Sequence, residues 1–557
     1  MINFLTKIKK EYCFLFLIIL LQILVFIHFF NIRTVTRCDE IWTFGLSNSH
    51  DYPVFWKNGF WPSPKNDFYN KWHDGKTWFN YITVQTNETF AFDRVYNNQR
   101  LDCHPPLYYF IVHFICSLFP NRFSLWFGEI INIIAFIITQ FFIFKLSLLL
   151  FKDTKYALAN VVFFGFSIAT TNINIYIGSY SILTMFIILY SYLCLKIISE
   201  NSLDTNYSIF IFLVGFLGFL THHYFALYLF SLSVEVVLYF LKTKKYKLVF
   251  KYSSLAIAAF VCYYAYFPFV FSHMNSMSRA LTSKGLFSIF PLKEVFTGLA
   301  FVINYTIGID TEILISIFRK LTYFIFFIAP YAKPCLILGI LFLVFFLYLK
   351  KDNINKLSFI FFEFLTVLIL ISSYTILNMQ LYFGRYFFPL MPLFCILVFG
   401  FIEWLLRIIK ITSKIKNYVI YILILVFLLS SHRNSAMEYC FTNLPSHEQM
   451  AELFKGASIV SVQKAYEEHF IHTKAQEYRY AKRIFPTREY EAEEINKAVN
   501  SISAYDKNYI IVPENEYGLL IVNMLKKEGF KPRYLFTDNH PDYIQMVFEI
   551  YANKIEE

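Results

Sequence analysis

Two acidic residues, Asp39 and Glu40, directly follow the first long apolar segment of the chain. A carboxylate at this place could act as a general base that takes a proton from a hydroxyl group, while its neighbour orients that hydroxyl or binds a cation. Because adjacent side chains point in different directions, the pair does not resemble the two opposed carboxylates of a glycosidase. An acidic pair is also typical of a solvated helix end, so its role depends on its surroundings.

A second candidate motif is the segment DCHPPLYY, from Asp102 to Tyr109, which lies just before apolar sequence resumes. The imidazole of His104 at a helix start could bind phosphate, because backbone N–H groups there already favour anions. Asp102 could hold this imidazole in one orientation. A rigid turn with His104 as a surface group is the simpler alternative.

Further polar residues lie at the ends of apolar segments. The guanidinium of Arg385, next to Tyr386, has a planar fork that matches the oxygens of a phosphate. The alternative is that the long side chain extends from the helix end so that its charge lies at the membrane–water interface. His222 and His223 could contact phosphate or bind a metal with Glu40. They lack the spacing of a known metal motif and would serve equally well as interfacial anchors. Whether a divalent metal is needed therefore stays open.

The composition predicts a polytopic membrane protein with all-α membrane segments. The 557-residue chain is 57% hydrophobic and only 16% charged, whereas soluble chains carry about 25% charged residues. Apolar runs of roughly 18–25 residues recur and fit the length of a membrane-spanning helix. We expect eleven spans, with thirteen as the alternative, because the segments 105–120 and 286–330 are ambiguous. The expected spans are 12–31, 125–150, 157–173, 178–198, 207–221, 222–241, 250–271, 332–349, 356–378, 386–406 and 416–431.

The net charge of +11 reflects basic residues in short loops. Such loops face the cytoplasm by the positive-inside rule, so the charge does not indicate a nucleic-acid partner. This orientation places the N-terminus in the cytoplasm and gathers the polar motifs near the external face. Polar groups at membrane depth are costly and are usually functional. The topology therefore predicts one site on the external side of the membrane.

The chain divides by composition into a membrane domain, 1–431, and a C-terminal soluble domain, 432–557. The membrane domain includes a large first external loop, 32–104, that is rich in tryptophan, and its aromatic side chains could stack on a sugar. The C-terminal domain alternates strand-like and helix-like runs, which predicts a small external α/β domain. Strands are expected at 458–462, 508–512, 533–536 and 544–551, and helices at 491–502 and 516–528.

The ordered set of motifs resembles the protein O-mannosyltransferase superfamily and its bacterial relatives, which are polyprenyl-phosphate-sugar-dependent glycosyltransferases of the GT-C fold. The resemblance covers roughly residues 10 to 430. It implies that Asp39 is the catalytic base and that His104 and Arg385 lie near the lipid phosphate. Tyr180 lies in a segment that often reads Arg-x-Tyr in the family, but Gly178 stands here in place of the arginine. The motifs that carry the resemblance are Asp39-Glu40, Asp102-Cys103-His104-Pro105-Pro106-Leu107, Thr221-His222-His223-Tyr224 and Arg385-Tyr386-Phe387-Phe388-Pro389.

The sequence thus predicts a membrane-embedded inverting glycosyltransferase that moves a sugar from a polyprenyl-phosphate donor to a hydroxyl of a lipid, glycan or protein acceptor. Asp39 and Glu40 are the expected catalytic residues, and Asp102, His104, Tyr180, Arg385 and Tyr386 the expected substrate-binding residues. A transporter or flippase for lipids or polysaccharides is the alternative, although no internal repeat typical of transporters is evident. The sequence does not identify the sugar or the acceptor.

Overall fold

A computed structural model describes most of the chain, and the fold is given for the described residues alone. The predicted span 332–349 lies outside them, as do Trp56 and Trp61 of the first loop. The described residues are 10–49, 68–277, 292–307, 356–377, 384–410, 412–430, 445–464, 471, 473–502, 507–540 and 543–551.

The chain forms two compact units, each built from segments that are far apart in the sequence. The first unit, called here the membrane unit, comprises Met1–Phe29 and Glu129–Met437. The second, called the loop–sheet unit, comprises Phe30–Gly128 and Glu438–Glu557. The first loop and the C-terminal segment therefore belong to one unit.

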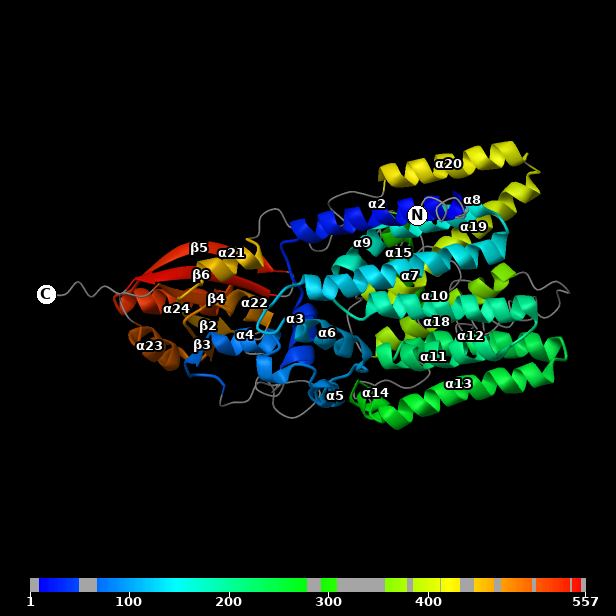
Figure 1. Cartoon of the computed structure of the whole chain (residues 1–557). Coiled ribbons are helices and arrows are strands. Elements are labelled where there is room, and N and C mark those ends of the chain that lie inside the picture. Colours follow the sequence, from blue (N-terminus) through cyan, green and yellow to red (C-terminus); the bar gives the residue numbers. More distant parts are fainter. Residues whose placement is uncertain are drawn as a thin grey trace, which may run out of the picture. The chain divides into compact units, whose positions relative to one another are not determined.

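The membrane unit consists of helices, and its long members follow the predicted apolar runs (Figure 1). Among the described residues, six helices are long and apolar enough to cross a membrane, or seven if the bent pair α8–α9 is one span. The chain is thus an integral membrane protein, and every predicted span within the described residues overlaps helical segments. The predicted span 157–173 falls on the bent pair α8–α9, and 386–406 begins in the 3₁₀ turn η5. The helices and the single 3₁₀ turn described in this unit are α2 (Lys10–Ile32), α7 (Trp126–Phe151), α8 (Thr154–Gly165), α9 (Ile168–Ile175), α10 (Tyr180–Glu200), α11 (Thr205–Thr221), α12 (Phe225–Lys242), α13 (Tyr246–Tyr266), α14 (Val270–Met277), α15 (Leu292–Ile307), α18 (Lys356–Leu377), η5 (Gly384–Leu390), α19 (Met391–Ile408) and α20 (Ser413–Ser430).

Local sequence explains two features of the helix packing. Helices α8 and α9 meet at an angle of 58° because Ser167 starts a new helix, its side chain accepting a hydrogen bond from the backbone N–H of Thr170. Helices α11 and α13 approach closely at Gly215, where an added Cβ would lie 3.2 Å from the Cβ of Ala259. Small residues at such contacts allow membrane helices to pack tightly.

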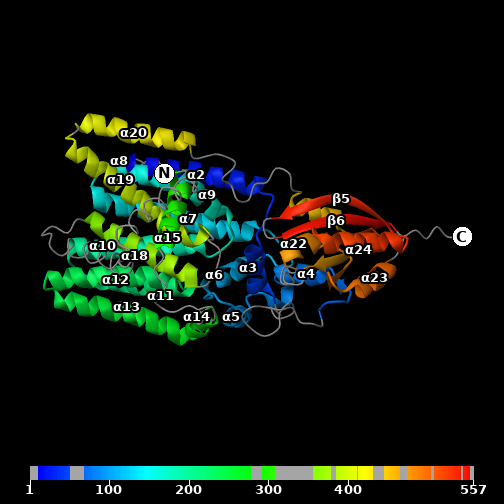
Figure 2. The same ribbon diagram turned by 180° about the vertical axis from the view of Figure 1, so that it is seen from behind.

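The loop–sheet unit is built on a six-stranded mixed sheet with the order β1-β3-β2-β4-β6-β5. Strands β5 and β6 at one edge of this sheet lie side by side in Figure 2. Strands β3, β2 and β4 run parallel to one another, whereas β1 and β6 are antiparallel to their neighbours. The α/β domain predicted at the C-terminal end is confirmed. The strands are β1 (His73–Asp74), β2 (Ser458–Gln463), β3 (Arg483–Arg488), β4 (Asn508–Pro513), β5 (Lys531–His540) and β6 (Tyr543–Tyr551). The helices are α3 (Cys38–Asn48), α4 (Lys76–Ile82), η2 (Thr86–Glu88), α5 (Phe92–Leu101), α6 (Leu107–Ser117), α21 (His447–Leu453), α22 (Ala475–Tyr478), α23 (Ala492–Asn500) and α24 (Glu516–Lys527).

The first loop contributes both a strand and core residues to this sheet. Strand β1 pairs with β3 through His73 and Ile484. Trp72 packs against the apolar core that α23 and α24 form on the sheet. Trp78 is fully buried, and its indole N–H donates to the carbonyl of Ile471. Trp72 and Trp78 therefore hold the loop to the sheet, which corrects the expectation that these aromatic side chains stack on a sugar.

Candidate active site

Helix α3 presents Asp39 in its first turn, and Glu40 fixes the start of that helix. Oε2 of Glu40 accepts hydrogen bonds from the backbone N–H of Arg37 at 2.7 Å and from Nη2 of Arg33 at 2.6 Å. Both side chains of the Arg33–Glu40 ion pair are almost completely buried. Asp39 lies in the first turn of the same helix and is half-buried. The two residues of the pair Asp39-Glu40 thus differ in burial, and Glu40 is the one that anchors the start of α3.

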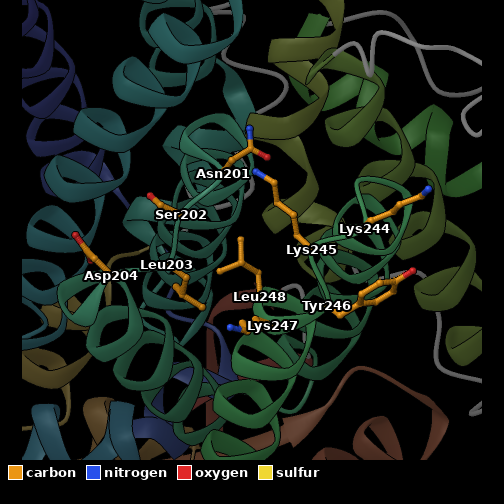
Figure 3. Close-up of a pocket in the computed structure, with 9 residues that line it drawn as sticks. All are labelled: Asn201, Ser202, Leu203, Asp204, Lys244, Lys245, Tyr246, Lys247 and Leu248. Carbon is orange, nitrogen blue, oxygen red and sulfur yellow. The ribbon is translucent and has the colours of Figure 1, made fainter.

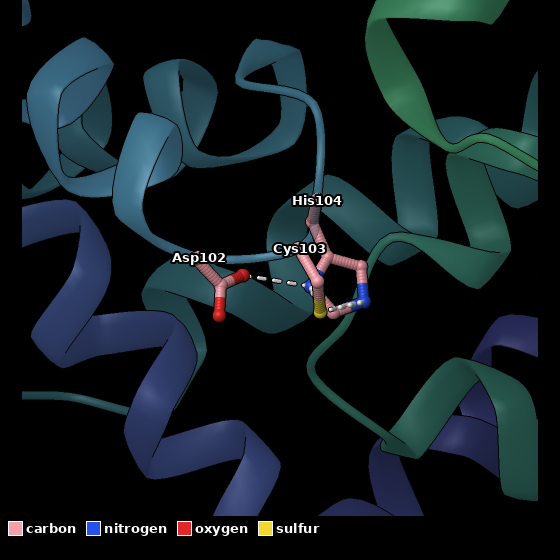
Figure 4. Close-up of side chains that lie close together, drawn as sticks. All are labelled: Asp102, Cys103 and His104. Carbon is pink, nitrogen blue, oxygen red and sulfur yellow. Dashed lines mark hydrogen bonds and ion pairs between the residues drawn. The ribbon is translucent and has the colours of Figure 1, made fainter. Parts of the chain in front are cut away.

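Asp102, Cys103 and His104 form a compact group between α5 and α6 (Figure 4). Nδ1 of His104 donates to Oδ2 of Asp102 at 2.8 Å, and the Cys103 sulfur lies 3.2 Å from the same nitrogen. The predicted orientation of the imidazole by Asp102 is therefore present in the structure. The His104 side chain remains 34% exposed, so an anion can reach it.

The surroundings favour a protonated imidazole at His104. Burial lowers the pKa of His104, but Cys103 and Asp102 raise it more, and the result is a pKa well above the usual 6.5. Burial and Asp102 also raise the pKa of the Cys103 thiol. Asp102, Cys103 and His104 therefore form one electrostatically linked group.

The structure brings Asp39 close to this group. The Asp39 carboxylate contributes, after burial and Asp102, to the raised pKa of both Cys103 and Tyr109. Electrostatic influence of this kind requires the charges to be near one another. Asp39 and His104, which are far apart in the sequence, thus lie in one region of the loop–sheet unit.

Metal-ligating atoms are grouped at one place among the described residues. Ligand atoms of Asp102, Cys103 and His104 lie within 4.8 Å of one another, and this donor set suits zinc. Neither Cys103 nor Cys38 forms a disulfide with a described residue. The predicted metal set of Glu40 with His222 and His223 is divided between the two units. That set stays a prediction.

In the membrane unit, Arg385 lies among aromatic side chains. Nη1 of Arg385 donates to the hydroxyl of Tyr176 at 3.0 Å, and its guanidinium lies over the rings of Tyr176 and Tyr386. The ring of Tyr180 lies 6.2 Å from that of Tyr386 and 5.5 Å from that of His222. The structure thus gathers four of the predicted residues, Arg385, Tyr386, Tyr180 and His222, in one chain of contacts. This group is called here the arginine–tyrosine cluster.

His223 does not share the ring contacts of His222. Its Nδ1 lies 3.3 Å from the hydroxyl of Tyr263, and its ring faces that of His273 at 5.7 Å. The two adjacent histidines therefore have different surroundings, as expected for neighbours at a helix end.

Several residues of these groups were not found from the sequence. Arg33 and Tyr176 carry no motif, and their roles arise from partners that the fold supplies. Tyr109 ends the DCHPPLYY segment, but the sequence predicted no role for it. A basic residue close before an acidic pair is the only signal that could have pointed to Arg33.

A separate cavity of about 720 Å³ lies in the membrane unit between the loops at 201–204 and 244–248 (Figure 3). Lys244, Lys245 and Lys247 contribute to its lining, and Lys245 extends toward Asn201. Within the described part of the chain, none of the predicted site residues lines it. The cavity coincides with loops whose basic residues predict a cytoplasmic position.

Comparison with known proteins gives a likeness in fold. No family model matches the chain, and no curated protein matches it in sequence. The structure is similar to that of ArnT from Cupriavidus metallidurans bound to undecaprenyl phosphate, with a TM-score of 0.47, 11% identity and coverage of 96% of this chain and 97% of that one. It is also similar to the Archaeoglobus fulgidus oligosaccharyltransferase in the apo form, with a TM-score of 0.44, 10% identity and coverage of 91% and 70%. A third similar structure is the oligosaccharyltransferase AglB from Archaeoglobus fulgidus in complex with an inhibitory peptide and a dolichol-phosphate, with a TM-score of 0.42, 9% identity and coverage of 90% and 69%.

Proposed function

We propose that the chain is a membrane-embedded inverting glycosyltransferase that moves a sugar from a polyprenyl-phosphate donor to an acceptor hydroxyl. The observation that carries the proposal is the carboxylate of the half-buried Asp39 close to the Asp102–His104 ion pair. A base beside a protonated imidazole suits a reaction that removes a proton from a nucleophile and leaves negative charge on a phosphate.

In the proposed reaction, Asp39 takes the proton of the acceptor hydroxyl as its oxygen forms a bond to the anomeric carbon. The bond from that carbon to the phosphate oxygen breaks, and the phosphate leaves with the electron pair. A single displacement inverts the anomeric configuration. The leaving phosphate needs no general acid, so one carboxylate suffices.

The negative charge that develops on the phosphate is stabilised by cationic groups. His104 meets this need because Asp102 favours its protonated form. The family resemblance assigns Arg385 to the same phosphate, and its aromatic surroundings hold the guanidinium in place. Tyr180, Tyr386 and His222 of the arginine–tyrosine cluster are proposed to line the donor. Glu40 is proposed to position Asp39 through the start of α3.

The proposed location of the reaction is the external face of a bacterial inner membrane. Basic loops such as 242–247 are expected in the cytoplasm, and the motifs Asp39-Glu40 and DCHPPLYY follow on the opposite side of the bilayer. The isoprenoid chain of the donor is proposed to lie against the membrane helices. Acceptors with lipid, glycan or protein hydroxyls all fit this arrangement.

The proposal is tested with purified protein in nanodiscs and a panel of radiolabelled polyprenyl-phosphate sugars. We expect the parent to transfer or release sugar and Asp39→Asn to lose this activity by roughly 10²–10⁴-fold, which is typical for loss of a general base. Asp93→Asn is the matched control, because Asp93 also lies in the first turn of a helix of the same unit but is exposed.

Equal activity of Asp39→Asn and the parent would show that Asp39 is not the base. If neither protein releases sugar from any donor, but the parent moves the intact lipid across the bilayer, the transporter alternative replaces the proposal.

A further inference from the structure

A buried histidine of the C-terminal segment contacts the backbone just before Asp39. Nε2 of His447 accepts a hydrogen bond from the backbone N–H of Thr36 at 2.8 Å. Its Nδ1 lies 3.1 Å from Oε1 of Glu477. Thr36 and Glu477 are buried, and the His447 side chain is only 10% exposed. This single imidazole thus connects two segments that lie about 400 residues apart in the sequence.

The donors and acceptors around His447 determine its protonation state. A backbone N–H can only donate, so Nε2 of His447 must carry a lone pair toward Thr36. The ring proton then lies on Nδ1 and is donated to the carboxylate of Glu477. His447 is therefore the neutral Nδ1–H tautomer in this arrangement, as assigned from its hydrogen-bond partners.

A buried ion network holds the Glu477 carboxylate in place. Nζ of Lys474 lies 3.0 Å from Oε2 of Glu477 and 2.9 Å from Oδ2 of Asp538. Burial lowers the pKa of Lys474, but Asp538 and Glu477 raise it more, so the ammonium stays charged. Burial disfavours the charged form of Glu477, but Lys474 and His447 keep the pKa of this carboxyl low. His447 thus faces the fixed carboxylate of Glu477, which belongs to the C-terminal part of the loop–sheet unit.

The contact at Thr36 acts on the segment that delivers Asp39. Arg37 is the N-cap of α3. The ion pair between Arg33 and Glu40 joins the residues before and after this N-cap. The Thr36 N–H lies immediately before this capped start, and Asp39 lies in the first turn. A rigid backbone at Thr36 therefore sets where the Asp39 carboxylate stands.

We propose that His447 is a positioning residue for Asp39, because its Nε2 accepts the hydrogen bond that fixes the backbone of Thr36 just before α3. The inference rests on the proposed function, in which Asp39 is the base. Loss of this hydrogen bond should loosen the start of α3 and displace the Asp39 carboxylate.

The test compares His447→Ala and His447→Gln with the parent in the sugar-transfer assay. His447→Ala removes the acceptor for Thr36, and we expect kcat/KM to fall by at least about tenfold, since small displacements of a catalytic group are costly. His447→Gln can place an amide oxygen near the position of Nε2, so it should keep most of the activity that His447→Ala loses.

A second readout does not depend on activity. Hydrogen exchange of the peptide 33–41 should quicken in His447→Ala, whereas exchange of the strand 458–463 stays as in the parent and shows that the sheet is intact. His73→Gln is the matched control, because His73 is a part-buried histidine of the same unit that contacts the carbonyl of Phe68 instead.

The possible outcomes separate this inference from the proposed function. Unchanged exchange at 33–41 in His447→Ala would overturn the anchoring role. Faster exchange with unchanged kcat/KM would overturn the link to Asp39. Full activity of Asp39→Asn in the same assay would instead refute the proposed base, whatever the exchange data show. If His447→Ala fails to fold, His447→Asn, whose shorter amide does not reach the position of Nε2, replaces it in both measurements.

Discussion

At the scale of single residues, Asp102 and His104 meet because they form a local motif, in which two side chains separated by one residue can pair without help from the rest of the fold. The sequence could therefore suggest this contact, whereas the binding of phosphate by the two residues stays a prediction. Asp102 is among the groups that raise the pKa of His104. If the imidazolium binds the donor phosphate, its affinity should depend on pH.

We predict that binding of a phosphodiester donor analogue weakens as the pH rises through the raised pKa of His104. The protonated form binds the anion and predominates below that pKa, so affinity is full at neutral pH and is lost on the alkaline side. Asp102→Asn removes the charge that raises the pKa, so the loss should move to lower pH. Titration calorimetry at a series of pH values measures both shifts.

A diester carries one charge throughout this range, so the ligand itself does not titrate. His104→Gln serves as the control and should bind about tenfold more weakly, in keeping with the loss of a charged hydrogen bond, and independently of pH. An identical pH profile of the parent and Asp102→Asn would contradict the prediction.

Arg385 gives a second prediction at this scale. Its planar fork donates to Tyr176 while lying over two tyrosine rings, and a lysine cannot reproduce this geometry. We expect Arg385→Lys to raise KM for the donor by about tenfold, which is ~1.4 kcal/mol. Arg407→Lys is the matched control, since the exposed Arg407 pairs with Glu403 one turn away. An unchanged KM in Arg385→Lys would argue against a phosphate role.

At the scale of elements, hydropathy predicted the membrane helices well because each apolar run must satisfy its own backbone hydrogen bonds as a helix. Strand β3 was not predicted, since Pro486 interrupts a pattern that otherwise reads as a strand. Strand β1 has only two residues and exists because β3 offers a partner edge. The sequence alone gives no sign of that edge, nor of Tyr176 as the partner of Arg385.

The fold also places a carboxyl group inside the helical bundle that no pattern suggested. Glu235 of α12 is 1% exposed, and neither of its carboxyl oxygens has a hydrogen-bond partner among the described residues. Nearby, Glu363 accepts a hydrogen bond from the hydroxyl of Ser191 at 2.8 Å. A buried carboxyl group without a partner is costly.

We therefore predict that Glu235→Met stabilises the protein by about 1–4 kcal/mol, the gain seen when buried charges are replaced by apolar groups. Thermal unfolding in detergent measures the change. Glu403→Met is the control, because Glu403 pairs with the exposed Arg407, and it should alter stability by less than about 1 kcal/mol. A clear loss of stability in Glu235→Met would mean that this carboxyl group has a partner that it needs.

At the scale of the whole molecule, the first loop and the C-terminal segment depend on each other. Strand β1 pairs with β3, the Trp78 indole donates to Ile471, and His447 accepts from Thr36. Composition could not predict this interdependence. It describes each segment separately, so it does not tell which core the hydrophobic side chains of a loop pack into. The tryptophan-rich loop carries part of a core whose sheet is encoded more than 350 residues later.

We predict that a chain truncated after Met437 keeps its membrane helices but loses the folded first loop. Removing Glu438–Glu557 takes away the sheet on which Trp72 and Trp78 pack, so trypsin should cut at Arg94 and Arg100 within minutes, whereas the parent resists. Deleting only residues 552–557 is the control and should leave the loop protected, because β6 ends at Tyr551. Co-expression of the fragment 438–557 with the truncated chain should restore protection, since the buried contacts between the two segments require no continuous backbone. If the loop of the truncated chain is protected without the added fragment, the loop folds without the sheet. Contacts within the loop would then be enough to position Asp39.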